Sequence, residues 1–229
     1  MICIKSVEVG TMPVELTDAV ALGVSVGLVF CYHLYLRRRL KSDPQFTVHA
    51  VNNVARARWV DAMMGAKGHE ILAVQTLRNS VMTASFMAST AILLMIATLS
   101  FVASNDHTGA VWHALNLAGA TDDRAVAVKV VFLLADFFTA FFCFSMAVRY
   151  FNHVGYMVTA HPEGVPGVTS PARVAAYLNR AGNFYAFGTR AFFYGVPLVF
   201  WMFGPTFFVA ATAMLLLALY PFDRAPKAA

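Results

Sequence analysis

The stretch EILAVQTLRNSVMTASFMASTAILLMIATLSF, from Glu70 to Phe101, decides the fold of this chain. It begins with the polar residues Glu70, Gln75, Arg78 and Asn79 and then continues for more than twenty residues without a charge. An apolar helix of roughly 20 residues is long enough to cross the hydrocarbon core of a bilayer. The stretch therefore predicts one long helix that leaves water, passes the membrane interface and enters lipid.

The composition of the whole chain supports a membrane protein. Of its 229 residues, 59% are hydrophobic and only 13% are charged, whereas soluble domains carry about 25% charged residues. The net charge of +5 is explained by basic residues that collect in cytoplasmic loops, so we expect a lipid bilayer and no nucleic acid as partner. The predicted fold class is an all-α integral membrane protein that forms a single membrane domain over residues 1–229.

Four apolar blocks predict four transmembrane helices joined by aqueous segments. The expected spans are residues 16–36, 80–103, 126–148 and 190–220, and the expected cytoplasmic segments, which contain amphipathic helices, are 37–79 and 149–189. At 1.5 Å per residue the fourth block is about 45 Å long, too long for a core of about 30 Å. Gly204 and Pro205 offer a break, so this block is either one kinked span or a re-entrant hairpin.

The distribution of Lys and Arg predicts the orientation. Eight basic residues follow the first span, whereas the loop after the second span contains one. Because Lys and Arg mark the cytoplasmic side, we expect both termini outside, in a bacterial inner membrane. The basic tail with Arg224 and Lys227 argues against that assignment for the C-terminus.

Two helices are expected in the cytoplasmic segments. One begins at Thr47 and places five residues on an apolar face that suits the plane of the membrane interface: Val48, Val51, Ala55, Trp59 and Met63. The other begins near Pro171, a residue that is favoured in the first helical turn. It is expected to end after Arg180, at Gly182.

Asp136 is the sharpest candidate for a functional residue. An Asp at the centre of a membrane helix costs about 2.5–3.5 kcal/mol on insertion scales. It should therefore face other helices and have a partner or be protonated, as an ion ligand, a proton relay or a polar lock between helices. The hydroxyl-rich face of residues 80–103 is expected to meet block 126–148 near this acid, with tight helix packing as the alternative explanation of that face.

A second candidate is a polar cluster on the cytoplasmic side, where three predicted spans begin or end. Its expected members are Glu70, Gln75, Arg78, Asn79, His153, Asn179, Arg180 and Arg190. The alternative is a structural network whose arginines contact lipid headgroups.

No motif indicates an enzyme, a cofactor site or a metal site. The sequence lacks a Walker A loop, a GxSxG elbow and paired HxxxH histidines. Asp106, His107 and His113 have unspecific spacing, and His33 is either a haem or metal ligand or simply hydrogen-bonded. We therefore predict no cofactor and no metal, and lean against catalysis.

Several motifs, taken in order, resemble one family. They are YHLYL at 32–36 with the following Arg run and Asp43-Pro44, Asn53-x-x-Arg56-x-x-Trp59-Val60, EILAVQTLRN at 70–79, Leu178-Asn179-Arg180 and Arg190-Ala-Phe-Phe. Together they are similar to the domain-of-unknown-function family 599, small membrane proteins of bacteria and plants, over nearly the whole chain. The resemblance implies a multi-span fold and assigns no catalytic or binding residue.

The preferred functional interpretation is a homo-oligomeric channel or transporter-like bundle with a polar site around Asp136 and the cytoplasmic cluster. Four spans make a small transporter, which is why oligomerisation is expected. One alternative is a structural or accessory subunit bound to another membrane protein. The third is a membrane enzyme that acts on lipids.

Overall fold

The computed structural model describes residues 14–65, 68–103, 123–160 and 169–226, and within them the chain is almost entirely helical. The helices are α1 (Val14–Ser42), α2 (Val48–Gly65), α3 (Glu70–Ala103), α5 (Asp123–Thr159), α6 (Pro171–Trp201) and α7 (Pro205–Asp223). The all-α prediction is confirmed, and α3 is the continuous helix that its sequence predicts.

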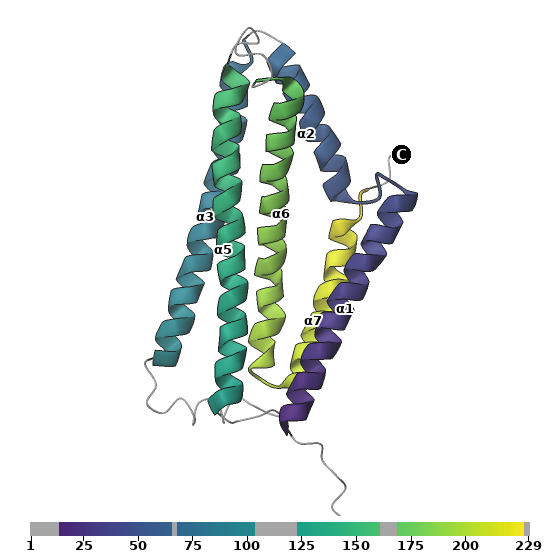
Figure 1. Cartoon of the computed structure of the whole chain (residues 1–229), viewed down its shortest axis with the longest axis vertical. Coiled ribbons are helices and arrows are strands. Elements are labelled where there is room, and N and C mark those ends of the chain that lie inside the picture. The colour runs from purple at the N-terminus through teal and green to yellow at the C-terminus, as the bar shows by residue number, and fades with distance from the viewer. Residues whose placement is uncertain (1–13, 66–67, 104–122, 161–168, 227–229) are drawn as a thin grey trace, which may run out of the picture.

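Three long helices, α3, α5 and α6, lie side by side at the centre of the fold (Figure 1). Small residues allow close packing there: Ala88 and Ala91 of α3 are buried in one cluster with Phe144 of α5. The hydroxyls of Thr83 and Thr90 donate to carbonyls of their own helix. Tight packing therefore explains this face of α3, and the expected meeting of its hydroxyls with Asp136 is wrong.

The chain reverses direction between α6 and α7, so residues 190–220 do not form one kinked span. The backbone N–H groups of Met202, Phe203 and Gly204 donate to carbonyls three residues earlier, each at 3.1 Å, and tighten the end of α6. Gly204 has φ 140°, a conformation that is open mainly to glycine. Pro205 then starts α7, and because proline has no backbone N–H it cannot continue the hydrogen bonds of α6. The hairpin is therefore the correct alternative.

Helix α7 runs back beside α1, on the far side of α6 from α5 (Figure 1). Its end is fixed to the α1–α2 connection, because Thr47 and Arg224 form a β-bridge and the N–H of Ala225 donates to the carbonyl of Phe46 at 2.9 Å. Helix α1 begins at Val14, and its other end, at Ser42, lies next to this contact. The first and last described residues, Val14 and Pro226, therefore lie at opposite ends of α1.

Four of the described helices, α1, α3, α5 and α7, are long and apolar enough to cross a membrane. Large apolar side chains on them are exposed, for example Phe86 at 73% and Leu217 at 76%, as suits surfaces that face lipid. Helix α3 has 34 residues, or about 50 Å, and so projects beyond a core of about 30 Å.

Helix α2 packs against the N-terminal half of α6 rather than lying in the interface plane. Val60 is fully buried in a cluster with Val174, Leu178 and Ala181. Val51 and Ala55, from the expected apolar face, are exposed. The buried face is therefore rotated from the expected one, and it also carries polar residues.

We predict that Gly204→Ala destabilises the protein. A side chain at this φ and ψ costs about 1–3 kcal/mol, so the melting temperature in detergent should fall. Gly27→Ala is the matched control, because a Cβ there meets nothing within 4 Å. Equal melting temperatures for the two variants would contradict the role given to the turn.

Candidate functional site

A buried ion pair joins α1 to α5, which we call the α1–α5 ion pair. Lys129 Nζ lies 3.1 Å from Asp18 Oδ2, and Trp201 Nε1 of α6 donates to Asp18 Oδ1 at 2.9 Å. The Lys129 ammonium also lies 5.7 Å from the centroid of the Trp201 ring. Asp18 is 7% exposed and Lys129 is 2% exposed. Three helices thus meet at one desolvated pair of charges.

A second ion pair joins α6 to α7, which we call the α6–α7 ion pair. Arg190 Nη2 lies 2.5 Å from Asp223 Oδ1, and the Tyr32 hydroxyl of α1 donates to Asp223 Oδ2 at 2.6 Å. Arg190 Nη1 lies 3.0 Å from His33 Nε2, while His33 Nδ1 lies 2.9 Å from the carbonyl of Val29. A neutral His33 that donates from Nδ1 and accepts at Nε2 satisfies both contacts. His33 is therefore hydrogen-bonded, which favours the simpler of its two expected roles.

Asp136 lies between the levels of these two ion pairs. It follows Lys129 by seven residues on α5, and Ser25 follows Asp18 by seven residues on α1, which moves both about 10 Å along their helices. Asp136 Oδ2 and Ser25 Oγ are buried without a hydrogen-bond partner among the described residues, and so is the hydroxyl of Tyr194 on α6. The interval between the ion pairs thus contains unpaired polar atoms.

The carboxylate of Asp136 lies against the backbone of α6. Its Oδ2 is 3.1 Å from the position that a Cβ on Gly195 would take, so the glycine makes room for the acid. Two residues on, Pro197 stands inside the helix. Proline has no N–H to offer the carbonyl of Phe193. Helix α6 therefore has one backbone carbonyl without its usual helical partner in the turn that contains Gly195.

Two cavities border the ion pairs. One of about 280 Å³ is lined by both members of the α1–α5 ion pair, together with Arg124 and Trp201. The other, of about 510 Å³, is lined by both members of the α6–α7 ion pair. Each ion pair thus lies in the wall of a cavity.

The expected cytoplasmic cluster does not form as one unit. Arg190 belongs to the α6–α7 ion pair, Asn179 contacts Arg56 of α2, and Arg180 lies over the ring of Tyr150 at 5.4 Å. The other expected members are exposed: Glu70, which accepts from the N–H of Gly68, and Gln75, Arg78, Asn79 and His153. The helices place these groups on different faces. The sequence indicated only that they lie toward the same side of the membrane, and not which way each side chain points.

Sequence reasoning missed three members of the ion pairs and the hydrogen-bonding Tyr32, and it misread Gly182. Asp18, Lys129 and Asp223 are charges at the edges of apolar blocks, and that position is the signal that could have identified them; Tyr32 gave no such signal. Helix α6 continues through Gly182, where the absence of a Cβ makes room for the Arg56 guanidinium. Asp106, His107 and His113 lie outside the described residues. Among those described, no group of three or more His, Cys, Asp or Glu could hold a metal.

Comparison with known proteins identifies a family whose function is unknown. A family model described as "Protein of unknown function, DUF599" matches residues 20–228. No curated protein and no solved structure matches the chain.

We predict that Lys129→Met lowers the free energy of unfolding by about 3–5 kcal/mol, because it leaves the buried carboxylate of Asp18 without its cation. The double variant Asp18→Asn with Lys129→Met should recover part of this loss. Chemical denaturation in detergent measures both, with Lys41→Met, an exposed lysine on α1, as control. A double variant less stable than Lys129→Met would argue against the pairing.

Proposed function

The chain belongs to the DUF599 family, whose function is unknown, and we propose that it is a membrane transporter that carries a proton or a small monovalent cation past Asp136. One observation carries the proposal: the Asp136 carboxylate has no cation within salt-bridge distance among the described residues, whereas Asp18 and Asp223 each have one. An acid inside a membrane bundle stays neutral only by binding a proton or a cation.

The surroundings of Asp136 support this role. Transporters often bind ions near the middle of the membrane, where interrupted helices expose backbone carbonyls. Helix α6 is continuous here, but Pro197 gives it one backbone carbonyl without a helical N–H partner, and Gly195 lies beside this acid. In the proposed cycle, the α1–α5 ion pair and the α6–α7 ion pair open in turn, so that one cavity at a time reaches Asp136.

The orientation follows from the basic residues at the end of α1 that carries Arg37, Arg38 and Arg39. By the positive-inside rule this end faces the cytoplasm. Arg224, which follows α7, lies at the same end, so we place the end of α7 on the cytoplasmic side and the start of α1 on the outer side. Lys227 lies outside the described residues. We place the protein in a bacterial inner membrane.

The proposal includes a homo-oligomer, because one chain has few spans for a transporter and several copies would form a larger bundle. Gentle purification should yield copies of this chain alone. Recovery of a stoichiometric foreign partner would favour the accessory-subunit alternative instead.

Asp136→Asn is predicted to reduce proton or cation flux in proteoliposomes to the level of empty liposomes, because the amide has no charge for the ion to balance. The melting temperature should not fall, since the amide has nearly the same shape. Asp61→Asn, which removes an exposed carboxylate on α2, should leave flux unchanged. Full flux through the Asp136→Asn protein would remove this acid from the mechanism.

A further inference from the structure

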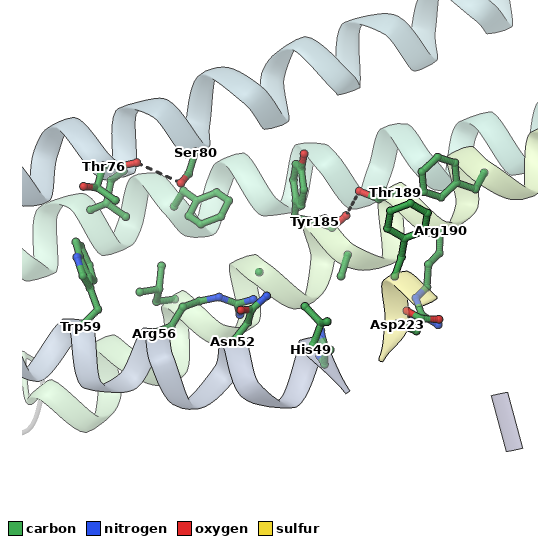
Figure 2. A pocket seen from close by; sticks show the side chains of 18 of the residues that line it. His49, Asn52, Arg56, Trp59, Thr76, Ser80, Tyr185, Thr189, Arg190 and Asp223 are labelled. Atoms are coloured by element: carbon green, nitrogen blue, oxygen red, sulfur yellow. Dashed lines mark hydrogen bonds and ion pairs between the residues drawn. The ribbon is translucent and has the colours of Figure 1, made fainter. Parts of the chain in front are cut away.

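The larger cavity, of about 510 Å³, has the size of a small-ligand site. Figure 2 shows it between α2, α3, α6 and α7, with Arg56 and Trp59 from α2 opposite Thr76 and Ser80 from α3. Its walls combine one cationic region with several aromatic and aliphatic side chains. This combination suits an amphiphilic ligand.

Arg56 is held rigidly at the cavity. Its guanidinium lies on the backbone of Gly182, where a Cβ would come within 2.2 Å of Nη1. The same Nη1 donates to Asn53 Oδ1 at 3.0 Å and to Asn179 Oδ1 at 3.3 Å. Asn179 Nδ2 in turn donates to the carbonyl of Asn53 at 3.1 Å. The side chain is thus positioned before any ligand arrives.

The positive charge of Arg56 is not offset within the described residues. Its partners are neutral amides, and no described carboxylate lies within 4 Å of it. Burial lowers the pKa of Arg56, and a guanidinium keeps its charge in proteins. Guanidinium has five donors, and the two bonds to the asparagines both leave from Nη1. The donors on Nη2 and Nε can therefore bind an anion in the fork geometry that suits phosphate.

The other titratable groups of the cavity do not change this balance. The charge of Arg190 is offset by Asp223. Burial, together with the charges of Arg56 and Arg190, lowers the pKa of His49, so its imidazole is neutral at pH 7. The lining therefore carries one uncompensated positive charge.

The cavity lies where a membrane span ends. Leu219, Phe222 and Asp223, from the last turn of α7, line it together with Phe193 of α6. Phe222 is 76% exposed, which suits contact with acyl chains. A free phosphate ion would use Arg56 but leave these apolar walls in contact with water.

We propose that this cavity binds one anionic phospholipid, with its phosphate on Arg56 and its acyl chains along the apolar side chains at the end of α7. Arg190 and Asp223 of the α6–α7 ion pair also line this cavity, but the phosphate contact on Arg56 involves neither of them, so lipid binding is tested apart from transport.

Native mass spectrometry of the purified full chain tests the site, with phosphatidylglycerol and phosphatidylcholine of equal chain length as probes. The wild-type protein should retain one phosphatidylglycerol in preference to phosphatidylcholine. Arg56→Gln should weaken that binding about tenfold or more, the effect of losing one charge-assisted contact. Arg56→Lys should restore part of it through charge alone.

Arg58→Gln is the matched control, because Arg58 lies on the same helix and is exposed; it should bind the lipid like the wild type. Equal melting temperatures of the variants establish that folding is intact. The proposal is overturned by unchanged binding in Arg56→Gln, by equal retention of both lipids, or by displacement of the lipid with excess inorganic phosphate.

Discussion

A charge buried between apolar helices must be offset by a partner, and this requirement sets the arrangement of the helices. Asp18 and Lys129 are almost fully buried and tie α1 to α5, with Trp201 adding α6 to the same contact. Arg190 and Asp223 tie α6 to α7, with Tyr32 adding α1. Breaking such a pair leaves an unpaired charge in a medium that solvates it poorly. The two ion pairs therefore hold the α1–α7 pair against the central helices at two levels.

Asp136 gains its significance from the same requirement. It lies between the two levels, and its Oδ2 is buried without a hydrogen-bond partner among the described residues. Its neighbours on α6, Gly195 and Pro197, respectively make room for it and free a backbone carbonyl nearby. Each of the two ion pairs offsets its own charges, whereas Asp136 between them has no cation beside it among the described residues. From this arrangement we infer transport. At the membrane surface Arg56 is the corresponding exception, and there we infer a lipid phosphate.

The sequence predicted what depends on local composition. The long α3, the all-helical fold and the membrane class follow from runs of apolar residues, and Asp136 stands out because a charge is rare inside such a run. The hairpin was predicted only as an alternative, since Gly204-Pro205 permits both a kink and a reversal and the φ of Gly204 decides between them. Pairings such as Asp18 with Lys129 join residues far apart in the chain, and no local pattern specifies them. Likewise, the sides on which α3 and α5 present their side chains depend on packing, so Arg78 and His153 do not join Arg190.

Electron–electron distance measurements on spin-labelled protein test most directly whether the two ion pairs act as separate contacts on either side of Asp136. In a variant without native cysteines, one label pair on Leu16 and Val128 reports the level of the α1–α5 ion pair, and another on Lys41 and Arg149 reports the opposite ends of α1 and α5. Lys129→Met should broaden and lengthen only the first distance, and Arg190→Gln only the second. Distances that stay unchanged in both variants, or change together in each, would contradict this account.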